Sequence, residues 1–416
     1  MKEFREESAE AISFWASLRY HIPLSTLKEG FFGLFIMSLM SLIAGVVLGM
    51  MIDVLQALPG LFLLITPAIG MRGNIFGAMG SRLGTALHTG MFSTSLNTNS
   101  ILSQNIYASM INTVLISFAL GIIAWLFAVL LKIESIGIVE FVLISMIGGI
   151  ISSVFVLLIT VGVAVMGYKR DWDIDNISAP IITAAGDMVT LPALFIAIIL
   201  IGNESSALHN ILFILFAILA VLNIIVIIVS KLDNMKRIIY ESIPVLLLAG
   251  VMSTAAGIII NSKLENFIAF PALLVMVPLF LEKNNALGGI LTSRLSTMLH
   301  TGLFNPGMLP GKEILPNVLL IYIYSIVIFP LVGVMAFAVS LLMEIETPGL
   351  NIMVFISTTA GFIAVAIVNV IGYYIALFTY KLRLDPDNHC IPMMSSIIDT
   401  FSAVCLVGMI MVVGLI

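Results

Sequence analysis

Two aspartates in apolar surroundings are the residues of this chain best suited to chemistry. Asp187 and Asp399 each lie inside a long hydrophobic stretch, one in each half of the chain. A carboxylate is costly to place in an apolar setting, so an aspartate at such a position indicates a functional site. Two neighbouring carboxylates repel each other or share a proton unless a cation lies between them, and hard divalent cations bind oxygen ligands of this kind.

The offset between these two aspartates also relates other polar groups, so the chain contains an internal repeat. Residues 81–92, SRLGTALHTGMF, return at 293–304 as SRLSTMLHTGLF. A chain that carries costly polar groups twice is expected to pair two copies of one site across a pseudo-two-fold axis. Thr183 and Ser395, one helical turn before each aspartate, are candidates for hydroxyl or water-mediated contacts with an ion. The further candidates in the second segment of each half are Asn74, Asn285, Ser81 and Ser293.

A second polar element precedes each aspartate. Asp175 and Asn176 return at the same offset as Asp387 and Asn388. An acidic entrance of this kind would concentrate cations. Asp and Asn before an apolar run are also good helix N-caps, so both interpretations stay open.

Four alternatives to a divalent-cation site between the two aspartates remain open. Asp187 and Asp399 could each pair with Arg82 or Arg294. Two membrane aspartates also suit an intramembrane aspartyl protease, although its usual Gly-x-Gly-Asp is replaced here by Ala-Ala-Gly-Asp at 184–187. The acidic cluster at 171–175 could hold a magnesium diphosphate, as in membrane prenyltransferases, but no matching basic pocket is evident. A Na⁺- or H⁺-coupled carrier of an organic solute would use the same scaffold.

The setting of these groups is a membrane. Of 416 residues, 60% are hydrophobic and 10% are charged, with a mean hydropathy of +1.17. Soluble domains carry about a quarter charged residues. The net charge of −5 and the scattered basic residues argue against a nucleic-acid partner. Cys390 and Cys405 would lie about 22 Å apart on a helix, too far to form a disulfide.

Runs of about 20 apolar residues read as membrane-spanning helices. The sequence predicts an all-α polytopic membrane protein with about eleven such helices, at 29–55, 58–90, 105–131, 135–168, 176–202, 207–230, 237–262, 266–300, 314–343, 348–380 and 388–416. The second span of each half is expected to be interrupted, because Pro67, Gly70 and Gly73 precede Asn74, and Pro278 precedes Asn285.

The span at 207–230 has no counterpart in either repeat, and this sets the topology. Five spans end on the side opposite to their start, so one additional span makes the second repeat parallel to the first. The expected organisation is an amphipathic cytoplasmic segment at 1–28, repeats at 29–202 and 237–416, and a linker helix within 203–236. Because two parallel repeats resemble the two subunits of a dimer, a monomer is expected to be functional.

Basic residues predict the orientation in a cell membrane, since cytoplasmic loops are enriched in Lys and Arg. With the N-terminus in the cytosol, the outer loops hold only Lys132 and Lys263, and the C-terminus lies outside. Twelve basic residues then fall in cytoplasmic segments: Lys2, Arg5, Arg19, Lys28, Lys169, Arg170, Lys231, Lys236, Arg237, Lys312, Lys381 and Arg383.

The combination of motifs resembles a known family. Pro67 with Arg72-Gly73-Asn74, the SRLGTALHTG and SRLSTMLHTG segments and the Gly186-Asp187 pair are similar to the membrane domain of the MgtE magnesium channels. They are closer still to the fused-repeat magnesium transporters of solute carrier family 41. The resemblance implies a Mg²⁺ path between the two halves, with Asp187 and Asp399 binding the ion. Na⁺ is a separate candidate, as a coupling ion. Half two departs from the pattern at Asn284 and at the residue before Asp399, which implies an asymmetric site.

Overall fold

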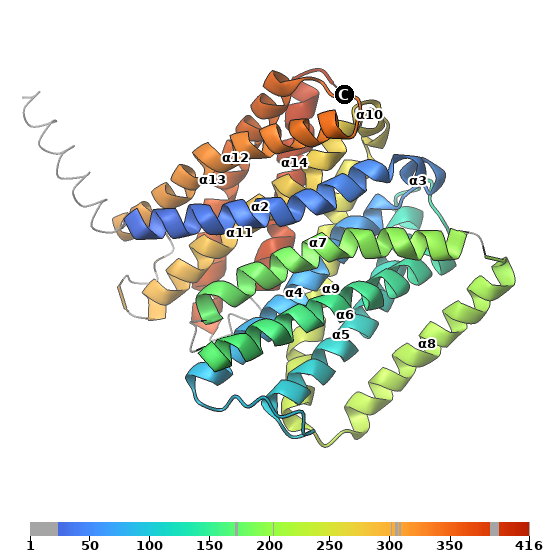
Figure 1. Ribbon diagram of the computed structural model, residues 1–416, viewed down its shortest axis with the longest axis vertical. Coiled ribbons are helices and arrows are strands. Elements are labelled where there is room, and N and C mark those ends of the chain that lie inside the picture. Colours follow the sequence, from blue (N-terminus) through green and yellow to red (C-terminus); the bar gives the residue numbers. More distant parts are fainter. Residues whose placement is uncertain are drawn as a thin grey trace, which may run out of the picture.

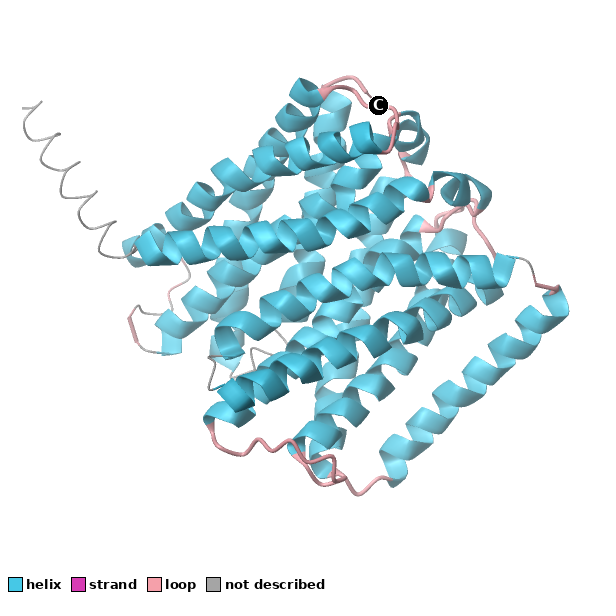
Figure 2. Ribbon diagram, in the orientation of Figure 1, coloured by secondary structure: helices cyan, strands magenta, loops and turns pink. Residues whose placement is uncertain are grey.

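The structure, a computed structural model, describes residues 24–170, 174–202, 204–300, 302–303, 307, 309–382 and 391–415. Within these residues all regular structure is helical, which confirms the predicted all-α class (Figures 1 and 2). Most of the expected amphipathic segment at 1–28 lies outside the described residues. The helices are α2 Leu24–Met50, α3 Ile52–Ala57, α4 Phe62–His88, α5 Ile101–Leu130, α6 Ile138–Arg170, α7 Ile174–Gly202, α8 Ser206–Val229, α9 Asp233–Asn261, α10 Leu264–Ala269, α11 Pro271–His300, the 3₁₀ turn η1 Lys312–Ile314, α12 Leu315–Leu342, α13 Leu350–Leu382 and α14 Ile391–Val412.

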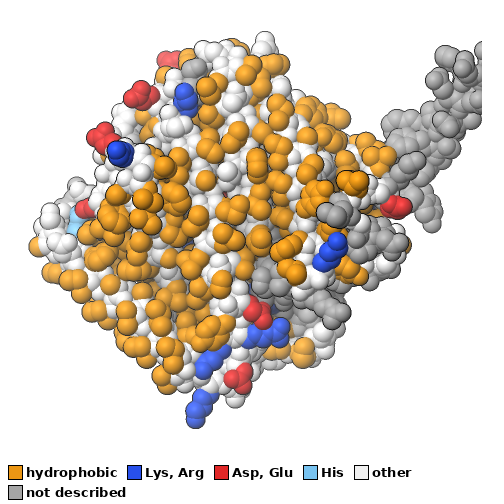
Figure 3. Space-filling view, turned by 180° about the vertical axis from the view of Figure 1, so that it is seen from behind, with side chains coloured by type: hydrophobic (Ala, Val, Ile, Leu, Met, Phe, Trp, Pro, Cys, Tyr) orange, Lys and Arg blue, Asp and Glu red, His pale blue; other side chains and the backbone are white. Residues whose placement is uncertain are grey.

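Eleven helices of the described chain are long and apolar enough to cross a membrane. Only the short helices α3 and α10 and the turn η1 fall outside that set. Figure 3 shows a wide hydrophobic surface, with charged side chains gathered toward its two ends. Such a band is what a bilayer covers, so the protein is an integral membrane protein.

The expected interruption of the second span in each half is wrong. α4 and α11 each continue through their internal proline, Pro67 and Pro278. A proline near the start of a helix removes one backbone hydrogen bond, a loss that surrounding helices can offset. Each span contains an apolar window of 18 residues. In α4 and α11, 89% and 78% of that window is buried, against 61% or less in the other nine spans. These two helices are the centre of the bundle.

The same hydrogen bond forms at two places that the repeat relates. Arg82 Nε donates to Asn105 Oδ1 at 2.8 Å, and Arg294 Nε donates to Asn317 Oδ1 at 2.6 Å. Each bond joins the second long helix of one half to the third. The repetition is consistent with the predicted order of five, one and five spans.

The first helix of each half packs against the second helix of the other half. Gly45 of α2 lies against the backbone of Val275 in α11, and Gly257 of α9 lies against Phe62 and Leu63 in α4. A side chain at either glycine would collide with that backbone, so the missing Cβ permits the close approach. The two halves therefore interlock instead of meeting at a flat interface.

Helix α8 lies at the edge of the bundle (Figure 1). It contacts the rest through α5 and α6, with the rings of Phe118 and Phe213 at 6.2 Å and His209 Nδ1 at 3.7 Å from Glu140 Oε1. Only 11% of its apolar window is buried, the least of the eleven spans. This peripheral position is consistent with a connector outside the repeats.

Candidate functional site

Asp187 of α7 and Asp399 of α14 line the same cavity inside the bundle. The cavity has about 30 Å³ of free space, and its other charged or amide residues are Glu282 and Asn285 of α11. Apart from Thr66, the remaining lining residues are apolar or glycine and belong to α2, α4 and α11. A volume of this size has room for about two water-sized particles.

Both aspartates are buried, but their hydrogen bonding differs. Asp399 is 3% exposed, and its carboxylate accepts hydrogen bonds from Asn285 Nδ2 at 2.7 Å and Ser253 Oγ at 3.2 Å. Asp187 is 7% exposed and accepts no hydrogen bond from any residue that the structure describes. A buried carboxylate without such a partner is energetically costly, and a cation beside Asp187 would lower that cost.

An amide oxygen adds to the set of hard donors. Asn285 Nδ2 donates a hydrogen bond to Asp399, while Asn285 Oδ1 is buried and has no hydrogen-bond partner in the described structure. Among the described residues, no three acidic, histidine or cysteine side chains form a preformed metal cluster. Two carboxylates, one amide oxygen and water are a donor set suited to Mg²⁺, which keeps several waters when it binds proteins.

The polar residues beside the aspartates connect helices. Ser395 donates to Asn74 Oδ1 at 3.0 Å, which joins α14 to α4 across the two halves. Thr183 faces α4 at Gly73 and Gly77. A Cβ added at Gly73 would lie 2.9 Å from Thr183 Cγ2, and one added at Gly77 would lie 3.2 Å from Thr183 Oγ1. Neither Asn74, Thr183 nor Ser395 lines the cavity.

The serines of the repeated motif lie farther along the helices. Ser81 is seven residues beyond Asn74, or about 10 Å along α4, and is half-buried. Ser293 is exposed, and its backbone oxygen accepts from Thr297. The structure does not bring these serines to the cavity.

The predicted acidic entrance is described only in part. Asp175 and Asn176 belong to the first turn of α7, where the side chains are not described. Asp387 and Asn388 lie outside the described residues. Its role stays a prediction.

The alternative in which each aspartate pairs with an arginine is wrong. Arg82 and Arg294 donate to asparagines of α5 and α12, and neither Asp187 nor Asp399 forms an ion pair with a described arginine. Because no described arginine neutralises Asp187 or Asp399, a mobile cation could do so.

Sequence reasoning gave no role to a charged pair at the cavity, Glu282 and Lys283. Glu282 is 3% exposed and lines the cavity, and its carboxylate forms an ion pair with the fully buried Lys283. Counted back from Asn74 and Asn285, these positions correspond to Met71 and Arg72 of half one, and at the offset that relates the two aspartates they correspond to Gly70 and Met71. Two adjacent charges within an apolar span are the signal that could have found them.

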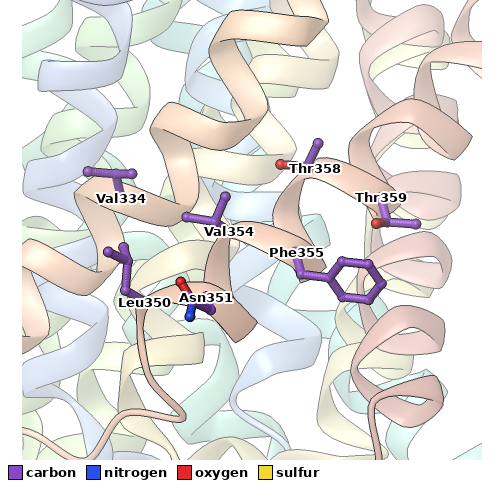
Figure 4. Close-up of a pocket in the computed structure, with 7 residues that line it drawn as sticks. All are labelled: Val334, Leu350, Asn351, Val354, Phe355, Thr358 and Thr359. Atoms are coloured by element: carbon purple, nitrogen blue, oxygen red, sulfur yellow. The ribbon is translucent and has the colours of Figure 1, made fainter.

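The larger hollow, of about 510 Å³, lies between α12 and α13 (Figure 4). Its walls are Val334, Leu350, Asn351, Val354, Phe355, Thr358 and Thr359. It holds no charged side chain, so it offers a cation no counter-charge. The smaller acidic cavity is the candidate ion site.

Comparisons with known proteins agree with this geometry. The family model MgtE, described as a divalent cation transporter, matches residues 65–197 and again residues 277–409. Proteins named solute carrier family 41 member 3 from Mus musculus and Rattus norvegicus are each 24% identical over 82% of this chain, covering 72% and 76% of their own lengths. Solute carrier family 41 member 2 from Xenopus laevis is 24% identical over 62% of this chain and 46% of its own. No solved structure matches.

The two matched ranges are equal in length, follow the same offset as the two aspartates, and together cover more than half of the chain. Each contains one of the two cavity aspartates, Asp187 or Asp399. A transporter family also decides against the protease and prenyltransferase interpretations. The chain belongs to the MgtE family of divalent cation transporters.

Proposed function

We propose that this protein carries Mg²⁺ across the membrane between its two halves, with the ion held between Asp187 and Asp399. The observation that carries the proposal is that these aspartates, one from each matched range, line one buried cavity. A divalent ion there would neutralise both carboxylates, which otherwise repel each other in a medium of low dielectric.

The cavity lies toward the end of the bundle where α2 ends and where α4 and α11 begin. Its apolar lining includes Leu48 near the end of α2, Phe62 at the start of α4, and Val277 and Pro278 in the first part of α11. The other side is crossed by the bond between Asn74 and Ser395, which would have to open for an ion to pass.

The repeat organisation belongs to the same proposal. We assign the repeats to 29–202 and 237–416, with the linker helix within 203–236 and residues 1–28 as a cytoplasmic segment. The halves would run parallel, related by rotation about the membrane normal, and the N-terminus would face the cytosol of a cell membrane. A single chain would then hold the whole path.

Mg²⁺ flux into liposomes that contain the purified protein tests this function. We expect uptake down a Mg²⁺ gradient, or uptake driven by an opposing Na⁺ or pH gradient if transport is coupled. Because the three gradients are imposed separately, the assay also decides between a channel and an exchanger. Absence of Mg²⁺ flux under every gradient would refute the proposal.

A further inference from the structure

The charged pair on α11 breaks the symmetry of the bundle. Arg72 of half one donates to Ser153 Oγ at 2.7 Å and to Ser117 Oγ at 2.8 Å, so it is held by neutral groups. The positions of half two that correspond to those serines by the repeat offset are Phe329 and Val365, which offer no hydroxyl.

Lys283, which precedes Asn285 by two residues as Arg72 precedes Asn74, is held differently. Its ammonium is fully buried and pairs with the carboxylate of the preceding residue, Glu282. Apart from that ion pair, neither carboxylate oxygen of Glu282 has a hydrogen-bond partner in the described structure. A buried charge held by one partner responds strongly to charges nearby.

Those nearby charges are the acids of the cavity. Glu282 lines the cavity together with Asp187 and Asp399, and Asp187 lies within electrostatic range of both Glu282 and Lys283. With all four groups ionised, three carboxylates and one ammonium leave two net negative charges. That is the charge that one divalent ion neutralises.

We propose that Glu282 and Lys283 set the charge of the ion site, and that Lys283 is the counter-ion that holds its acids together when the site is empty. This inference rests on the proposed function. It assigns the pair a role in ion affinity, whereas a purely structural ion pair would act only on folding. It also explains how half two can differ from half one without losing the site.

The inference predicts opposite effects from the two halves of the pair. Lys283→Met leaves three net negative charges and should lower the half-saturating Mg²⁺ concentration by about tenfold or more. Glu282→Gln leaves one net negative charge and should raise it by a similar factor. The double variant restores two negative charges and should fall within about threefold of the wild type.

The measurement is the melting temperature of the purified full-length protein against Mg²⁺ concentration, together with Mg²⁺ flux in liposomes. Arg237→Gln and Glu241→Gln are matched controls, because these residues form an acid-base pair on α9 with 2.8 Å between Arg237 Nε and Glu241 Oε1. Glu241 lies twelve residues, or about 18 Å, before Ser253, which bonds Asp399. Neither control should change the half-saturating concentration.

Three outcomes separate the possibilities. Opposite shifts in the two single variants support the inference, whereas weakening in both, or no shift in either, overturns it while the proposed function stands. If Mg²⁺ neither stabilises the wild-type protein nor enters liposomes that contain it, the proposed function and this inference are overturned together. If Glu282→Gln leaves Lys283 buried alone and does not fold, Lys283→Met compared with the double variant gives the same test.

Discussion

Replacing Asn285 with alanine tests whether the groups around Asp399 bind an ion. The variant loses the 2.7 Å hydrogen bond to Asp399 Oδ1 and the unpartnered amide oxygen beside the cavity. A hydrogen bond to a charged group contributes about 1.5–3 kcal/mol, so the metal-free protein should be destabilised by that amount. Loss of one oxygen ligand should also weaken Mg²⁺ binding by about tenfold or more.

The effect on ligand-linked stability can be worked out. At a Mg²⁺ concentration 100 times the wild-type Kd, binding stabilises the wild type by about 2.7 kcal/mol. A variant that binds tenfold more weakly would gain only about 1.4 kcal/mol at the same concentration. The assay is the melting temperature measured over a Mg²⁺ titration.

The adjacent Asn284 provides a matched control. Its amide nitrogen donates to Phe280 O within the same helix at 2.9 Å, and its Oδ1 is buried without a partner. Asn284→Ala removes a local bond and also a buried unsatisfied oxygen, so the two effects should largely offset each other. Full Mg²⁺ stabilisation is expected. Equal loss of Mg²⁺ stabilisation in the two alanine variants, or full retention in Asn285→Ala, would refute the reasoning.

Two further predictions concern the scaffold. Gly73→Ala should lower the melting temperature, because its Cβ would lie 2.9 Å from Thr183 Cγ2, and adding Thr183→Ser should restore it by removing that methyl group; a double variant no more stable than the single one would contradict this packing. Asn105→Leu and Asn317→Leu should each destabilise the protein by about 1–3 kcal/mol, because a part-buried arginine loses one hydrogen bond, without changing the half-saturating Mg²⁺ concentration. A shift in that concentration would show that these bonds belong to the ion site.

The fold could be predicted well because hydropathy and repetition act at the level of whole helices. The predicted span 207–230 matches α8, Ser206–Val229, and 176–202 matches α7, Ile174–Gly202. The prediction of a break is wrong for α4 and α11, because both helices continue through their proline and glycine residues. Whether a proline interrupts a helix depends on how well neighbours pack around it, which a single segment does not reveal.

The site could be predicted only in outline. Asp187 and Asp399 could be identified from the sequence because an isolated acid in an apolar segment is energetically costly and therefore rare. Their partners, Asn285 and Ser253, depend on which helices meet, and α9 reaches Asp399 from another part of the chain. Hydropathy and repetition do not specify that contact.

The residue before Asp399 illustrates the same limit. Gly186 of half one lets α7 approach the backbone of α4 closely, since a Cβ there would lie 3.0 Å from Gly73 N. Half two has Ile398 in its place, and this side chain packs against Gly288 of α11. In half two the small residue at this contact is therefore Gly288, on the facing helix. A departure from the motif is thus compensated by a partner that only the three-dimensional structure identifies.

Mg²⁺ uptake by liposomes that contain Asp187→Asn, Asp399→Asn or the double variant tests the central claim most directly. Asparagine keeps the size of the side chain but removes a charge, and one carboxylate half-neutralises a divalent ion. We predict that each single variant loses at least about tenfold in uptake and most of its Mg²⁺-dependent stabilisation, while still folding in metal-free buffer. Wild-type uptake and full Mg²⁺ stabilisation in both single variants would contradict the account and turn attention to the entrance at Asp175 and Asp387.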